Sequence, residues 1–79
     1  PMTRLAQVAR LLPAWRVSVD VHAKSGKFRL LLWRHPHKVV GLWRETIEAA
    51  VDAGIEKILE HPRLTADLPD LRRLEEVQP

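Results

Sequence analysis

The segment from Lys27 to Lys38 places cations, two imidazoles and one indole among leucines. Arginine and lysine bind phosphate, and an indole stacks on an unpaired base, so this composition suits contact with single-stranded nucleic acid. Tryptophan and arginine are also enriched at protein interfaces. The segment therefore favours a binding function and leaves two classes of partner open, a nucleic acid or another protein.

The predicted nucleic-acid surface combines cations that would contact phosphates with one tryptophan that would stack on a base. Its members are Arg16, Lys24, Lys27, Arg29, Trp33, Arg34 and Lys38. The alternative is a protein-binding module, such as an inhibitor, adaptor or homodimeric assembly factor. It would use two apolar residues of the same segment together with a row of acidic residues that recur every four positions. Its predicted residues are Leu31, Trp33, Glu48, Asp52 and Glu56.

Charge is distributed unevenly along the chain. Residues 1–44 carry nine Lys and Arg against the single acid Asp20, a net charge of +8, whereas residues 45–79 carry four against nine acids, a net charge of −5. Such asymmetry is typical of proteins that contact polyanions, and it equally suits a basic protein partner or self-association.

Metal and catalytic chemistry are not expected. His35 and His37 are two residues apart and His22 precedes them on an adjoining segment, but no acid lies at a spacing that would complete a set of three or four ligands. The serines, Ser18 and Ser25, lie outside any nucleophile motif, and the three glycines are too scattered for a phosphate-binding loop. We therefore predict no metal, no cofactor, no catalytic residue and no enzymatic activity.

The composition predicts one small domain. The 79 residues are 46% hydrophobic and 29% charged, which is typical of a globular chain. Pro1 precedes Met2 and is interpreted as a remnant of tag cleavage, so the expected domain spans residues 2–79. There is no cysteine, and the longest apolar run, Leu30 to Trp33, is far too short to span a membrane. We expect a cytoplasmic protein without a membrane partner.

The predicted fold class is α+β. A short helix, capped by Thr3 and stopped by Pro13, precedes a two-stranded antiparallel hairpin; a long amphipathic helix and a short C-terminal helix follow. Residues 15–23 alternate with period two, and a two-residue Ser-Gly turn is predicted to pair them with the strand that begins at Phe28, so that Val21 lies opposite Leu30. Residues 38–44 could form a third strand with a bulge at Gly41, but their lack of alternation favours a long helix that already includes them.

This arrangement divides the hairpin into two faces. One face is apolar and should form the core with the long helix, burying Val19, Leu32, Ile47, Val51, Ile55 and Ile58 together. The other face is mixed, because Arg16, Ser18, Asp20 and His22 lie beside Arg29, Leu31, Trp33 and His35. Leu31 and Trp33 on that face need a cover, and a short sheet is marginal alone, so we expect a homodimer.

If the third strand forms, the order of elements becomes that of double-stranded-RNA-binding domains. Those domains place lysines at the start of the final helix to hold phosphate, whereas Glu45 and Glu48 occupy that region here. No resemblance is inferred from the order alone, and single-stranded nucleic acid remains the favoured ligand.

Overall fold

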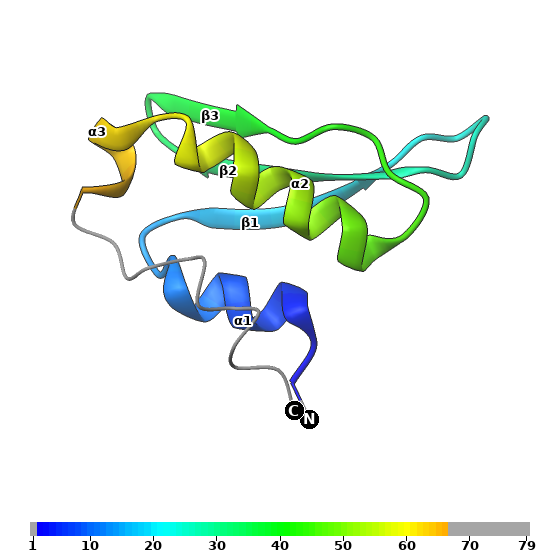
Figure 1. Ribbon diagram of the computed structural model, residues 1–79, viewed down its shortest axis with the longest axis horizontal. Coiled ribbons are helices and arrows are strands. Elements are labelled where there is room, and N and C mark those ends of the chain that lie inside the picture. The colour runs from blue at the N-terminus through cyan, green and yellow to red at the C-terminus, as the bar shows by residue number, and fades with distance from the viewer. Residues whose placement is uncertain (1, 67–79) are drawn as a thin grey trace.

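The computed structural model describes residues 2–66, whose elements follow in the order α1 (Arg4–Leu11), β1 (Arg16–Val21), β2 (Phe28–Arg34), β3 (His37–Val40), α2 (Ile47–Leu59) and α3 (Pro62–Thr65) (Figure 1). The α+β fold is therefore confirmed, with three antiparallel strands in the order β1-β2-β3. The short C-terminal helix is predicted after Pro62, and most of that segment lies outside the described residues.

The first helix forms for the expected reason. The Thr3 hydroxyl accepts a hydrogen bond from the backbone N–H of Ala6 at 3.1 Å, which satisfies one of the unpaired donors at the start of a helix. The helix ends at Leu11, before Pro13, whose ring cannot continue it. Val8 and Leu12 are fully buried, so the apolar side of α1 joins the core.

The hairpin forms, but its predicted register was wrong by two residues. Val19 lies opposite Leu30, because the strands are joined by a four-residue loop, residues 23–26, in place of the two-residue turn. The His22 N–H donates to the Lys27 carbonyl at 2.9 Å, and the Gly26 N–H donates to the His22 carbonyl at 2.8 Å. Gly26 has a φ of +71°, which only glycine adopts at little cost. A shift of two residues keeps every side chain on its predicted face.

The preference for a long helix through residues 38–44 was also wrong. Residues 37–40 form β3, and α2 starts only at Ile47, where the Thr46 hydroxyl accepts from the backbone N–H of Ala49 at 3.1 Å. Leu31 pairs with Val40 and Phe28 pairs with Arg44. Between these two pairs, the three residues that separate Val40 from Arg44 lie opposite only two residues of β2. This extra residue is a bulge at positions 41–43, and it removes the alternation by which a strand is recognised in sequence.

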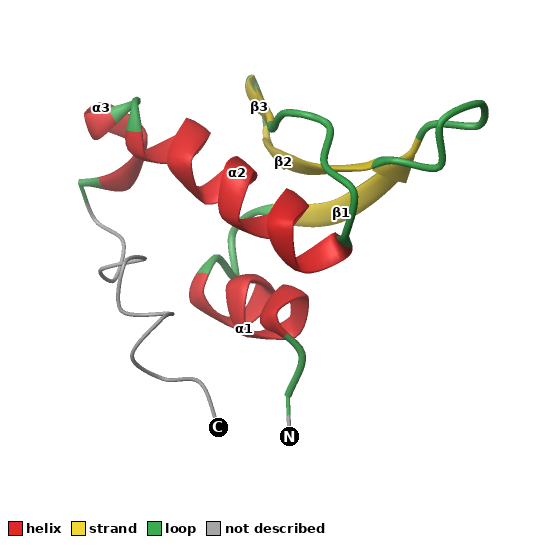
Figure 2. Ribbon diagram, turned by 45° about the vertical axis from the view of Figure 1, so that its right-hand side comes forward, coloured by secondary structure: helices red, strands yellow, loops and turns green. Residues whose placement is uncertain are grey.

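Two helices, α1 and α2, lie against the same face of the sheet (Figure 2). That face contributes Leu30, Leu32 and Val39 to the core, which also contains Val8, Leu12, Trp15, Val51, Ile55 and Ile58. Four of the six predicted core residues are thus buried together. Val19 is only partly buried, and Ile47, the first residue of α2, is 40% exposed.

Candidate nucleic-acid interface on the open sheet face

The second face of the sheet carries no helix from the described residues, and we call it the open face (Figure 2). The strand register assigns it the following side chains, three each from β1 and β2 and two from β3: Arg16, Ser18, Asp20, Arg29, Leu31, Trp33, Lys38 and Val40. They form three rows across the strands, and each row has a different chemistry.

The first row is cationic and aromatic. Trp33 lies on the central strand, opposite Arg16 of β1 on one side and opposite Lys38 of β3 on the other. The Trp33 side chain is 48% exposed, and the Lys38 ammonium lies 5.9 Å from the centroid of its indole. Arg16 and Lys38 are exposed, and within residues 2–66 neither forms an ion pair. This row therefore presents an accessible indole between two accessible positive charges.

The middle row is largely apolar. Leu31 lies between Ser18 and Val40, and both apolar side chains are half-buried. These two side chains give the face an apolar centre on which a flat ligand or an apolar side chain could lie.

The third row is an ion pair covered by an indole. The Arg29 guanidinium donates from Nε to Asp20 Oδ2 at 3.1 Å, and its Nη2 lies 3.0 Å from the same oxygen as an ion pair. Its Cζ lies 4.3 Å from the centroid of the Trp43 ring, which is within range of a cation–π interaction. Sequence reasoning missed Trp43 because the bulge decides its face. Without the bulge, Trp43 would lie opposite Phe28, on the side of the core.

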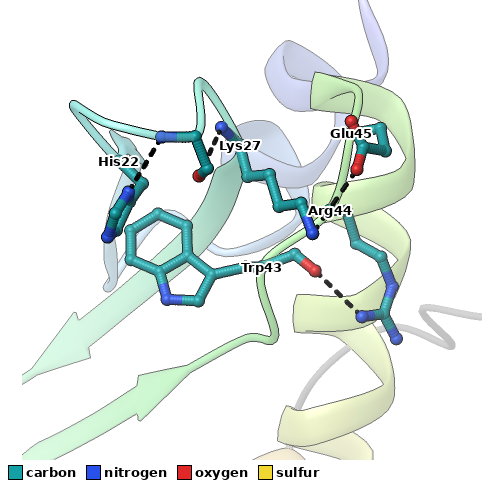
Figure 3. A network of polar contacts seen from close by, with 6 residues as sticks. His22, Lys27, Trp43, Arg44 and Glu45 are labelled. Atoms are coloured by element: carbon teal, nitrogen blue, oxygen red, sulfur yellow. Dashed lines mark hydrogen bonds and ion pairs between the residues drawn. The ribbon is translucent and has the colours of Figure 1, made fainter.

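Two of the predicted phosphate contacts, Lys24 and Lys27, belong to the protruding hairpin end, at the opposite end of β1 and β2 from the first row (Figure 1). Figure 3 shows Lys27 beside Glu45. Lys24 is exposed in the four-residue loop. The Lys27 ammonium lies 3.4 Å from Glu45 Oε1, and so it already neutralises a carboxylate. The His22 ring meets Trp43 edge to face at 5.2 Å and accepts at Nδ1 from the Ser25 N–H.

Arg34 is placed apart from the other candidates. Its side chain projects toward the opposite face of the sheet, where its Cζ lies 5.0 Å from the centroid of the buried Trp15 ring. Of the seven residues predicted to contact nucleic acid, the structure brings Arg16, Trp33 and Lys38 together in one row. Arg29 shares their face but is engaged by Asp20.

The five residues predicted for a protein interface do not form one surface. Leu31 and Trp33 belong to the open face, whereas Glu48, Asp52 and Glu56 lie on the exposed side of α2, in the helical layer. Asp52 also accepts from Arg4 of α1 at 2.6 Å, and this ion pair joins the two helices.

Other classes of site find little support in the described part of the chain. Among residues 2–66, no three His, Asp or Glu side chains lie close enough together to hold a metal ion. The first turn of α2 contains Glu48 and no cation, so it offers no phosphate-binding helix start. Within the same range, no helix is both long and apolar enough to cross a membrane.

Comparisons with protein-family models, with curated proteins and with solved structures found no match for this chain. Its function is therefore inferred from the geometry of the open face.

Proposed function

We propose that this protein is a non-enzymatic, cytoplasmic regulatory or accessory module that binds single-stranded nucleic acid on its open face. The observation that carries the proposal is the row in which the half-exposed Trp33 lies between Arg16 and Lys38. An indole supplies a stacking surface for an unpaired base, and a cation on each side can neutralise the flanking phosphates. A base in a duplex is already stacked between its neighbours, so single strands are the favoured ligand.

The phosphate contacts are assigned first to Arg16 and Lys38. Lys27 and Arg29 already have carboxylate partners, and a phosphate would have to compete with Glu45 or Asp20 for them. Lys24 remains a predicted contact for a strand that extends toward the hairpin loop.

Replacing Arg16 with alanine should reduce the salt dependence of binding. If Arg16 neutralises one phosphate, the slope of log affinity against log salt for a single-stranded oligonucleotide should become shallower by about 0.7. Fluorescence anisotropy at several salt concentrations measures this slope. Arg10→Ala is the matched control, because Arg10 is an exposed arginine on α1 and its loss changes the net charge equally. Equal slopes for the two variants would remove Arg16 from the phosphate contacts.

Replacing Trp33 with alanine should weaken binding without changing the salt slope. The loss of one stacked base is expected to cost about 1 to 3 kcal/mol at every salt concentration, because stacking involves no release of counterions. Thermal unfolding should change little, since Trp33 is 48% exposed. The same anisotropy titration, run beside wild type on single-stranded and duplex oligonucleotides, tests this. An unchanged affinity in a folded Trp33→Ala protein would overturn the proposal.

The half-buried Leu31 and Val40 beside Trp33 favour a second candidate, a protein-binding module in which this face docks on a protein, including a second copy of the chain. Our prediction of a homodimer belongs to this candidate. Sedimentation at micromolar concentration distinguishes the two: a dimer that dissociates on Trp33→Ala substitution, together with no salt-sensitive binding to any oligonucleotide, would favour the protein partner.

A further inference from the structure

A second tryptophan lies at the opposite end of the open face from Trp33. The bulge at positions 41–43 places Trp43 beside Arg29, which is four residues before Trp33 on β2. A strand rises about 3.3 to 3.4 Å per residue, so Trp33 and Arg29, beside which Trp43 lies, are separated by roughly 13 Å along the central strand. The half-buried Leu31 lies between them.

Contacts within the chain hold the indole of Trp43. The Arg29 guanidinium covers part of the ring at 4.3 Å and is itself held by Asp20, and the exposed His22 borders the ring. The Trp43 side chain nevertheless remains partly exposed. A fixed aromatic surface loses little conformational freedom when a base stacks on it, and this preorganisation favours binding.

Resting on the proposed function, we infer that Trp43 forms a second base-stacking subsite and that the ligand is an unpaired strand long enough to reach from Trp33 to Trp43. The incoming base stacks on the part of the indole that Arg29 leaves uncovered, and Arg29 contributes a positive charge behind the ring. Stacked bases rise about 3.4 Å each, so about four steps bridge the two platforms. A hexanucleotide can occupy both platforms at once, whereas a dinucleotide can occupy only one.

The inference predicts a dependence on ligand length that involves both tryptophans. For single-stranded hexathymidylate, Trp33→Ala and Trp43→Ala should each weaken binding by about 5- to 150-fold, which corresponds to about 1 to 3 kcal/mol for one stacked base. For dithymidylate each variant should lose much less, because the remaining platform still holds a base. Leu42→Ala is the matched control, since it removes an exposed apolar side chain next to Trp43 and should leave both affinities unchanged.

A direct readout does not require the removal of Trp43. In a Trp33→Phe protein the remaining tryptophans are Trp43 and Trp15, and Trp15 is only 6% exposed. Hexathymidylate should quench the Trp43 emission, and a sugar-phosphate hexamer without bases should not. This measurement tests whether a base stacks on Trp43 even if the Trp43→Ala protein fails to fold.

The outcomes separate the two proposals. A folded Trp43→Ala protein that binds hexathymidylate like wild type, or a Trp43 emission that hexathymidylate leaves unchanged, overturns the second subsite. If Trp33→Ala still weakens binding in that case, the proposed function stands with a single platform. If neither substitution weakens binding, the proposed function fails as well.

Discussion

Replacing Ile55 with alanine is expected to lower the free energy of unfolding by about 2 to 4 kcal/mol. Ile55 is 7% exposed and lies in the cluster where α2 meets the sheet, so the truncation removes buried apolar surface and leaves a cavity. A loss of this size is a large share of the stability of a small domain. Urea denaturation followed by circular dichroism measures it.

Ile47→Ala is the matched control for this prediction. It removes the same atoms from the same helix, but Ile47 is 40% exposed, so the expected loss is below about 1 kcal/mol. Equal losses at the two positions would mean that the buried side of α2 has been assigned incorrectly.

Replacing Gly54 with alanine is expected to destabilise the protein by about 1 to 3 kcal/mol, although alanine is the better helix former. A Cβ at Gly54 would lie 2.6 Å from Leu30 Cβ and 2.9 Å from Leu30 Cγ, and Leu30 is fully buried on the central strand. The nearest Leu30 atoms include the Cβ, which cannot move away without its backbone. The same denaturation experiment measures the loss.

The control for Gly54 is the exposed position Glu56 on the same helix. There, the alanine variant should be more stable than the glycine variant by about 1 kcal/mol, which is the intrinsic difference between the two residues in a helix. If Gly54→Ala stabilises the protein by a similar amount, α2 does not pack as closely on β2 as the structure shows.

This close packing also bears on the open face. A Cβ at Gly41 would lie only 2.9 Å from the Cα of Gly54, so the start of the bulge rests directly against α2. The Gly41 N–H donates to the Leu30 carbonyl at 2.9 Å and keeps the bulged segment on β2. The contact between these two glycines thus helps to set the position of the segment that carries Trp43 to the other face.

The sequence alone was sufficient to predict those elements whose apolar residues recur with a clear period. The two-residue period of residues 15–23 predicted β1 and the side of the sheet on which each of its residues lies, because successive side chains of a strand point to opposite faces. The spacing of Val51, Ile55 and Ile58 predicted the buried side of α2, because residues three and four apart share one side of a helix.

The register of the hairpin could not be predicted from the same pattern. A shift of two residues leaves every side chain on its face, so the pairing of Val21 with Leu30 and the observed pairing of Val19 with Leu30 satisfy the hydrophobic pattern equally. The loop decides between them, and the hydrogen bonds of His22 with Gly26 and Lys27 close four residues in place of two. The consequence for the candidate site is direct, since this register sets Arg16 opposite Trp33.

The third strand and the place of Trp43 were decided only by the tertiary structure. A bulge adds one residue to a strand and reverses the alternation beyond it, so Val39, Val40, Leu42 and Trp43 do not read as a strand in the sequence. What holds the bulged segment is remote in sequence: β2 supplies its hydrogen bonds, and Gly54 of α2 leaves room for Gly41. The identity of the candidate cations was readable from the sequence, but which of them share a face with an exposed indole depends on these long-range contacts.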